Sequence, residues 1–309
     1  MKAVRYHAYG GSDVLTYEEA ERPVPGAGQV LVRVAGTSFN GVDAGIRAGA
    51  LREVFPVDFP HVPGIDVAGT VAEVGAGVDG WQAGDAVVAF LPMTADGAAA
   101  EYVVAPAEAL AAAPRTVDLA DAAALPAVGL TAWQSLFELA GLTAGQSVLV
   151  NGAGGAVGGY AVQLAHAAGA TVTATARPRH ADRLRGYGAD RVIGHLDLTA
   201  DPVAAEGAPY DVVLNLVATT PEETAALAGL VTGGGVLVST TTPPPERSGI
   251  RTARAFVQSR AGELAELVAR VDAGTLRIHV AARRPLSDLA AVHDEAAAGR
   301  LPGKTVLAP

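Results

Sequence analysis

The sequence predicts an α/β protein of two domains, one a compact, barrel-like β domain and the other built on a doubly wound parallel sheet. Three observations predict this class. The chain has 309 residues, which corresponds to about two domains of ordinary size. Residues 1–110 carry short apolar runs between Gly and Pro residues, whereas the middle of the chain alternates strand-like and helix-like segments. Half of all residues are hydrophobic and 17% are charged, as in ordinary globular proteins.

The N-terminal region contains four strand candidates, each bounded by turn-forming residues. These are residues 30–35, 67–74, 86–91 and 102–105. Short, regularly spaced strands with Gly and Pro between them are typical of small β-barrels. We therefore expect a barrel-like domain here.

The middle of the chain alternates between two kinds of segment. Strands are expected at 147–151, 171–176, 191–193, 211–217 and 235–240, and helices at 156–168 and 181–187. Because strands that alternate with helices form parallel sheets covered by helices, the pattern predicts a doubly wound sheet. Residues 242–245 (TPPP) form a loop.

The C-terminal segment is too short to fold alone. It contains an amphipathic helix at 262–272, a short strand at 276–280 and a second helix at 286–298. We expect it to pack back on the first domain. The predicted domains are therefore residues 1–122 with 259–309, and residues 123–258.

Charge and composition exclude several functions. The net charge of −10 leaves no general basic surface for nucleic acid. The absence of cysteine removes disulfides, thiol catalysis and cysteine-ligated zinc. The N-terminus lacks the apolar core of a secretory signal, and no apolar run approaches the length of a membrane span. We expect a cytoplasmic protein with neither membrane nor nucleic-acid partners.

Residues 147–158, SVLVNGAGGAVG, run from an apolar strand through a glycine-rich turn into a helix. The glycines permit a tight turn, and the helix N-terminus offers free N–H groups to phosphates. This context predicts a dinucleotide site at Gly152, Gly155 and Gly158. The alternative is a tight turn in an α/β protein that binds nothing.

The residues after the second strand of this region are basic. Arg177, Arg179 and His180 stand where NAD sites usually carry an acidic residue, and residues 139–181 contain no Asp or Glu. A guanidinium matches a 2′-phosphate in charge and geometry, so the sequence favours NADPH, with Arg177 as its principal contact. The alternative is that these residues begin a solvated helix face with Arg183 and Arg185.

Several longer segments carry a family resemblance. They are VRVAGTSFNGVDAGIRAG, FPHVPGIDVAGTVAEVGAGVDGWQAGDAVVAF, LPAVGLTAWQSLF, VLVNGAGGAVGGYAVQLAHAAGA, YGADRVI, DVVLNLV, GGVLVS and GKTVL. With these, the chain resembles the zinc-independent quinone oxidoreductase branch of the medium-chain dehydrogenase/reductase superfamily. The resemblance implies a GroES-like catalytic domain, a Rossmann domain, an active site in the cleft between them, and a homodimer. Residues 249–257 look like an exposed sheet edge, which a second copy would extend.

The resemblance also bears on metal and reaction. Zinc-dependent relatives carry ligands at the positions of Asn40, Ile65 and, approximately, Ala127, none of which is a zinc ligand here. Without a Lewis acid, alcohol oxidation is disfavoured. The implied reaction is metal-free hydride transfer from NADPH to a small hydrophobic electrophile, either a quinone or an α,β-unsaturated carbonyl.

The resemblance implies the site residues. Asn40 and Thr131 are the expected catalytic residues. The expected cofactor contacts are Gly152, Gly155, Ala156, Val157, Gly158, Thr175, Arg177, Arg179, His180, His195, Val217, Ser239, Phe256, Val257 and Lys304.

Alternatives stay open for several residues. Asn40 would otherwise be a turn residue and His195 a loop residue. Asp43 and Asp66 are interpreted as structural, pairing with an arginine such as Arg47. No tyrosine follows Asn40 where some enoyl reductases hold a proton donor. Two other functions compete: an enone reductase that tailors a secondary metabolite, and an NADPH-binding sensor without catalysis.

Overall fold

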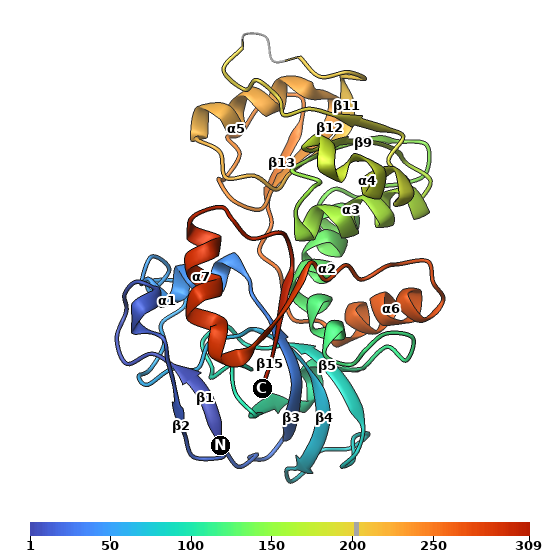
Figure 1. Ribbon diagram of the computed structural model, residues 1–309. Helices are drawn as coiled ribbons and strands as arrows, with labels where there is room; N and C mark the ends of the chain where they lie inside the picture. The colour runs from blue at the N-terminus through green and yellow to red at the C-terminus, as the bar shows by residue number, and fades with distance from the viewer. Residues whose placement is uncertain (201–203) are drawn as a thin grey trace. The chain divides into compact units, whose positions relative to one another are not determined.

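The computed structural model describes residues 1–200 and 204–309. The chain divides into two compact units (Figure 1). Unit 1 comprises Met1–Ala127, Ser259–Gly274 and Ile278–Pro309, and unit 2 comprises Val128–Gln258 and Thr275–Arg277. Within the described ranges, no helix combines the length and the apolar character that crossing a bilayer requires.

Unit 1 is built on a mainly antiparallel sheet of seven strands and a separate two-stranded pair. The larger sheet has the order β14-β15-β3-β4-β5-β7, and β6 also pairs with β3. Its strands are β3 (Gln29–Ser38), β4 (Asp66–Val74), β5 (Ala86–Phe90), β6 (Tyr102–Pro106), β7 (Leu110–Ala112), β14 (Ala282–Pro285) and β15 (Thr305–Ala308). The pair is β1 (Lys2–Arg5) with β2 (Thr16–Glu19). The four strand candidates of the N-terminal region are confirmed.

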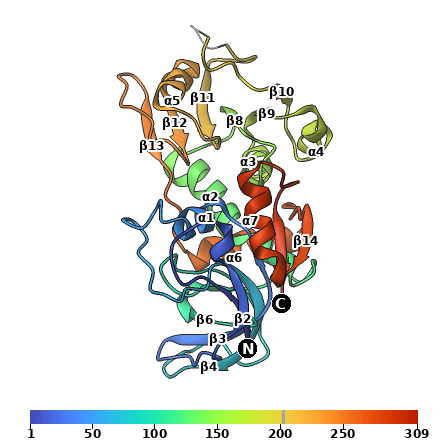
Figure 2. The same cartoon turned by 60° about the vertical axis from the view of Figure 1, so that its left-hand side comes forward.

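Alternation along β3 builds the core of this unit. Val30, Val32 and Val34 project to one side of the strand and join a buried apolar cluster. The helices of the unit are α1 (Gly41–Arg47), α6 (Ala261–Asp272) and α7 (Leu289–Ala297). Helix α6 buries the stripe that its sequence predicts and packs on β7. Figure 2 shows α7 beside the C-terminal strands β14 and β15.

Unit 2 contains a six-stranded sheet in the order β10-β9-β8-β11-β12-β13, and every neighbouring pair is parallel. Its strands are β8 (Ser147–Asn151), β9 (Thr171–Thr175), β10 (Arg191–Ile193), β11 (Tyr210–Asn215), β12 (Val231–Ser239) and β13 (Arg251–Arg254). The strand order reverses between β8 and β11. In doubly wound sheets, ligands bind outside the carboxyl ends of the strands at such a reversal.

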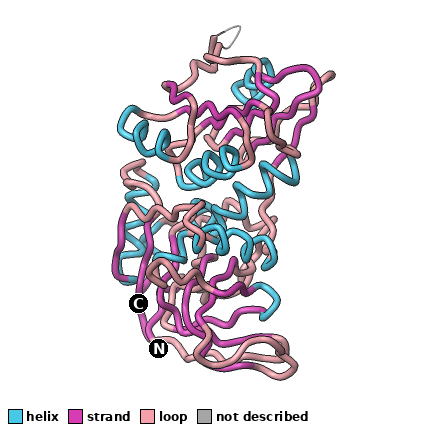
Figure 3. The backbone as a smooth tube through the Cα atoms, turned by 90° about the vertical axis from the view of Figure 1, so that its right-hand side faces the viewer, coloured by secondary structure: helices cyan, strands magenta, loops and turns pink. Residues whose placement is uncertain are grey.

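Helices cover the sheet of unit 2 (Figure 3). They are α3 (Ala156–Ala167), α4 (Ala181–Gly186) and α5 (Pro221–Leu227), and α2 (Pro126–Trp133) leads into the unit. Helix α3 packs on β8 and β9, α4 beside β10, and α5 on β12. The expected doubly wound parallel sheet is therefore confirmed. Strand β13 forms its edge, and pairing of this edge with a second copy stays a prediction.

The strand predicted at 276–280 is wrong. Residues 276–280 are not in a strand, and β14 lies further along the chain. Gln163 accounts for part of the difference. Its Oε1 accepts the backbone N–H of Arg277 (2.7 Å) and its Nε2 donates to the Arg277 carbonyl (3.2 Å). A side chain thus takes the backbone groups that a strand partner would need.

Candidate functional site

The glycine-rich turn lies at the carboxyl end of β8 in unit 2. Gly152 adopts φ +91°, which favours glycine, and a Cβ there would lie 2.7 Å from Val217 Cγ2. A Cβ on Gly158 would lie 2.4 Å from the backbone of Ala153. The turn therefore requires glycine at both positions: Gly152 permits the bend, and Gly158 permits the close approach of α3 to the turn.

The N-terminus of α3 faces out of this turn. Its N-cap is Gly155, whose extended backbone carries no side chain to cap the helix. Gly155 is exposed, and Ala156 and Val157 are half-buried. The first N–H groups of a helix and its dipole attract anions. This geometry fits the pyrophosphate of a dinucleotide.

The basic residues after β9 differ in what they contact. Arg183 donates from Nη2 to the Gly154 carbonyl (2.9 Å), and Arg179 donates from Nε to His180 Nε2 (3.2 Å). Arg177 is exposed, and within the described part of the chain its guanidinium has no hydrogen bond or ion pair. Arg177 is therefore open to an external phosphate, whereas Arg179 and Arg183 each already make a hydrogen bond within the described residues.

The other predicted cofactor residues of unit 2 fall into two groups. The hydroxyl-bearing Thr175 and Ser239 are fully buried and bond within the unit. Their side chains are therefore closed to direct contact in this structure. The remaining residues are at least partly accessible: His195, Val217, Phe256 and Val257.

Unit 1 contains a buried polar cluster centred on Asp66, at the start of β4. One carboxylate oxygen accepts the backbone N–H of Ala127 (2.7 Å). The other accepts from Ser38 Oγ (2.5 Å), Asn40 Nδ2 (2.8 Å) and Lys304 Nζ (3.2 Å). Asp66 is fully buried and Lys304 is 6% exposed. A buried charge pair of this kind persists only when hydrogen bonds satisfy both partners, as they do here.

Asn40 is held on both sides of its amide. Its Oδ1 accepts from Lys304 Nζ (2.7 Å), and its Nδ2 donates to Asp66 and to the Ser38 carbonyl (3.2 Å). It is the N-cap of α1, yet its side chain makes no capping bond to that helix. Lys304, predicted as a cofactor contact, is therefore a buried neighbour of Asn40.

Asp43 lies in the first turn of α1 and is buried. One oxygen accepts the Gly64 N–H (3.1 Å), and the other has no hydrogen-bond partner among the described residues. Burial, with a further contribution from the Asp66 charge, raises the pKa of Asp43 to about 7.

The expected pairing of these aspartates with Arg47 is wrong. Two guanidinium nitrogens of Arg47 are buried without a hydrogen-bond partner in the described structure. Burial lowers its pKa, and the acidic groups that counter this effect are Asp294 and Asp13. Asp66 pairs instead with Lys304, from the far end of the chain. The sequence could not reveal this partner, because 238 residues separate them.

The residues present do not fit a catalytic zinc ion. Ile65 and Ala127 have no side-chain ligand atom, and the amide oxygen of Asn40 faces an ammonium group. Across residues 1–200 and 204–309, no group of three His, Cys, Asp or Glu side chains could hold a metal.

The two predicted catalytic residues lie in different units. Asn40 belongs to unit 1, and Thr131 lies half-buried on α2 in unit 2. Sequence reasoning missed Ser38, Asn151 and Asn215 as polar members of these sites. Two of them carried a signal, because each is a polar residue that ends an apolar strand, VLVN or VVLN.

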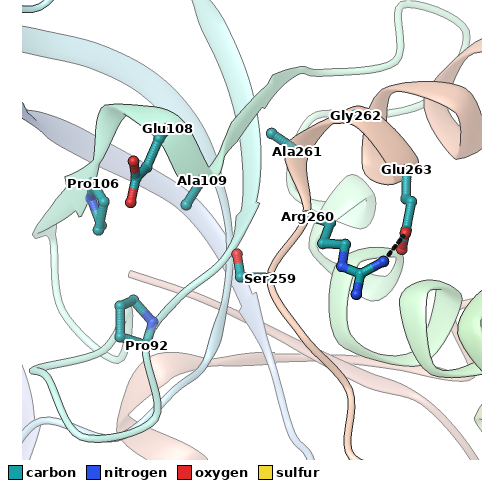
Figure 4. A pocket seen from close by; sticks show the side chains of 9 residues that line it. All are labelled: Pro92, Pro106, Glu108, Ala109, Ser259, Arg260, Ala261, Gly262 and Glu263. Carbon is teal, nitrogen blue, oxygen red and sulfur yellow. Dashed lines mark hydrogen bonds and ion pairs between the residues drawn. The ribbon is translucent and has the colours of Figure 1, made fainter.

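A separate pocket of about 550 Å³ lies in unit 1 (Figure 4). Its wall includes Glu108, Ser259 and the start of α6. There Arg260 Nη1 donates a hydrogen bond to Glu263 Oε1 (3.0 Å). None of the predicted site residues lines it.

The fold defines the class: an α/β protein with a GroES-like unit and a Rossmann-like unit. Residues 26–115 match the family described as alcohol dehydrogenase GroES-like domain, and residues 187–307 match zinc-binding dehydrogenase. The chain belongs to the quinone oxidoreductase branch of the medium-chain dehydrogenase/reductase superfamily.

Three similar proteins illustrate this membership. A chloroplast envelope quinone oxidoreductase homolog of Arabidopsis thaliana is 32% identical, over 100% of this chain and 98% of the relative. An NADPH-dependent alkenal/one oxidoreductase of the same plant is 39% identical, over 70% of this chain and 57% of the relative. The solved quinone oxidoreductase of Coxiella burnetii has a TM-score of 0.89 and 28% identity, covering 100% of this chain and 99% of its own.

Proposed function

We propose that this protein transfers a hydride from NADPH to a quinone or an α,β-unsaturated carbonyl without a metal ion. The observation that carries the cofactor choice is Arg177, an exposed and unpaired guanidinium after β9, in the stretch 139–181 that contains no Asp or Glu. A ribose 2′-phosphate would give it the partner it lacks. The NADPH-dependent alkenal/one oxidoreductase among the relatives supports the same choice.

The bound nicotinamide would supply the hydride. The protein would bind the cofactor, orient the acceptor and polarise its carbonyl group. In an enone, hydride adds to the β carbon and negative charge develops on the oxygen. A fixed donor near that oxygen lowers the barrier. Asn40 is such a fixed group, because Lys304 and Asp66 hold its amide in one orientation. Its longer bond, to the Ser38 carbonyl at 3.2 Å, is the one it would exchange for a substrate oxygen.

The residues of the site suit an acceptor that is already electrophilic. Asn40, Ile65 and Ala127 do not fit a zinc ion that could polarise the substrate, so an unactivated carbonyl would gain little from this site. The names of the relatives, quinone oxidoreductase and alkenal/one oxidoreductase, support both acceptor classes. An enone reductase that tailors a secondary metabolite would be one case of the enone-reducing activity. A sensor would bind NADPH without oxidising it.

The experiment follows reduced-nicotinamide absorbance with a simple quinone or an alkyl enone, each with NADPH or NADH. NADPH is expected to be consumed faster in at least one mixture. Arg177→Ser should raise the KM for NADPH about tenfold and leave the KM for NADH unchanged, since a charged hydrogen bond is lost. Arg185→Ser is the matched control, because Arg185 is exposed nearby but already paired with Asp182.

Two results would count against the proposal. An equal rise in the KM for NADPH in Arg177→Ser and Arg185→Ser would contradict the role of Arg177. Tight NADPH binding without consumption in any mixture would favour the sensor.

A further inference from the structure

The carboxyl ends of four neighbouring strands in unit 2 carry buried polar side chains. Thr175 ends β9, Asn151 ends β8, Asn215 ends β11 and Ser239 ends β12. All four are at most 4% exposed. Asn151, Asn215 and Ser239 are direct neighbours in the strand register. An apolar sheet thus ends in a row of polar groups with no access to water.

These side chains form an unbroken chain of hydrogen bonds. The Gly152 N–H donates to Thr175 Oγ1 (2.9 Å), whose hydroxyl donates to Asn151 Oδ1 (2.8 Å). Asn151 Nδ2 then donates to Asn215 Oδ1 (2.9 Å). The Thr175 hydroxyl thus accepts from a backbone N–H and donates its single proton to Asn151. That direction fixes the orientation of both amides.

At its far end the chain reaches the segment after β11. Asn215 Nδ2 lies within bonding distance of Thr219 Oγ1 (3.1 Å), the Val217 carbonyl (3.2 Å) and Ser239 Oγ (3.3 Å). The two connected segments also touch directly, since a Cβ on Gly152 would meet Val217 Cγ2. The chain therefore joins the glycine turn to the segment 216–219, on either side of the strand-order reversal.

We propose that Thr175, Asn151 and Asn215 are positioning residues for the dinucleotide, an inference that rests on the proposed function. They hold the turn against the segment 216–219, so the N–H groups that receive the pyrophosphate are already in place before binding. Thr175 is fully buried and acts through Gly152. Because the pyrophosphate is common to both cofactors, these residues control affinity for NADPH and NADH alike, whereas Arg177 controls the choice between them.

Two isosteric variants on one strand test the proposal. Thr175→Val removes the link to Gly152. Thr173→Val is the matched control, since Thr173 is equally buried on β9 and its hydroxyl, which lies beside Tyr210, makes no hydrogen bond to Gly152, Asn151 or Asn215. Dissociation constants for NADPH and NADH are measured by nucleotide fluorescence. Thr175→Val should raise the dissociation constants for NADPH and NADH about fivefold, and Thr173→Val should leave both constants unchanged.

A double variant tests whether the chain acts as one unit. Asn215→Ala, at the far end, should also weaken NADPH binding. Thr175→Val with Asn215→Ala should weaken it by less than the product of the single effects, because the first break already frees the turn. Circular dichroism on each variant checks that the molecules measured are folded.

Three results would overturn the inference. One is a folded Thr175→Val protein whose affinities equal those of Thr173→Val, which would give the chain a purely structural role. Another is a double variant that weakens NADPH binding by the full product of the two single effects. The third is failure of the unaltered protein to bind NADPH, which would contradict the proposed function as well. The first two results leave the proposed function standing, so the outcomes distinguish the two claims.

Discussion

Asp43 and Asp66 are two buried carboxyl groups in unit 1 that the fold treats differently. Asp66 receives four hydrogen bonds, one of them from the Lys304 ammonium. Asp43 receives one from a backbone N–H and leaves one oxygen unpartnered. A buried carboxyl with few donors favours its protonated form. Asp43 thus remains partly neutral near pH 7, and the Asp66–Lys304 pair balances its own charge.

Replacing Asp43 by Asn tests this state through the pH dependence of stability. The folded pKa of about 7 lies above the unfolded value, so between about pH 4 and 7 the folded state binds more protons. Asp43 therefore stabilises the fold at low pH and this contribution is lost as pH rises through 7. Asp43→Asn should lose less stability than the unaltered protein between pH 5 and 8, measured by urea unfolding. Equal losses would show that Asp43 is ionised throughout.

Single residues differ in how far the sequence reveals their roles. The turn at Gly152 was predictable, because a local motif indicates it, while the cofactor role of Arg177 stays a prediction. Lys304 and Gln163 were not, since their partners are distant in sequence and only the packed fold brings them together. The buried amides Asn151 and Asn215 gave a weaker signal, a polar residue at the end of an apolar strand.

At the scale of elements, the packing of helix α3 beside β8 depends on one glycine, Gly158. A Cβ on Gly158 would lie 2.4 Å from the Ala153 backbone, whereas a Cβ on Gly159 would have only Tyr187 Cε2 at 3.6 Å nearby. The first contact would push α3 away from the turn that follows β8, and the second is an ordinary van der Waals contact. The strand, turn and helix were predictable because their apolar periods are long and their turn residues are distinctive.

Exchanging these neighbouring glycines for alanine separates packing from helix propensity. Gly158→Ala should destabilise the protein by about 1–3 kcal/mol through overpacking, and should weaken NADPH binding as the turn shifts. Gly159→Ala should be neutral or stabilise by up to about 1 kcal/mol, because alanine favours helix. Thermal and urea unfolding provide the comparison. Equal destabilisation by both variants would contradict the role given to Gly158.

At the scale of the whole molecule, the sequence predicted both kinds of sheet, and the superfamily is shown by the family matches and the relatives. The sequence-based prediction was wrong at 276–280, where an apolar alternation resembles a strand. There the side chain of Gln163 hydrogen-bonds the backbone N–H and carbonyl of Arg277. Local pattern does not reveal such competition. The pairing of Asn40 with Thr131 in one reaction stays a prediction, as does the choice of acceptor.

The most direct test of the account is the fate of the hydride. NADPH that carries deuterium at the transferred position of the nicotinamide is mixed with the protein and a simple alkyl enone, and the product is analysed by NMR. The account predicts a saturated ketone with deuterium on the β carbon, or, if the acceptor is a quinone only, a slowed oxidation of deuterated NADPH by quinone. An unlabelled product, or no oxidation of NADPH by either acceptor, would contradict it.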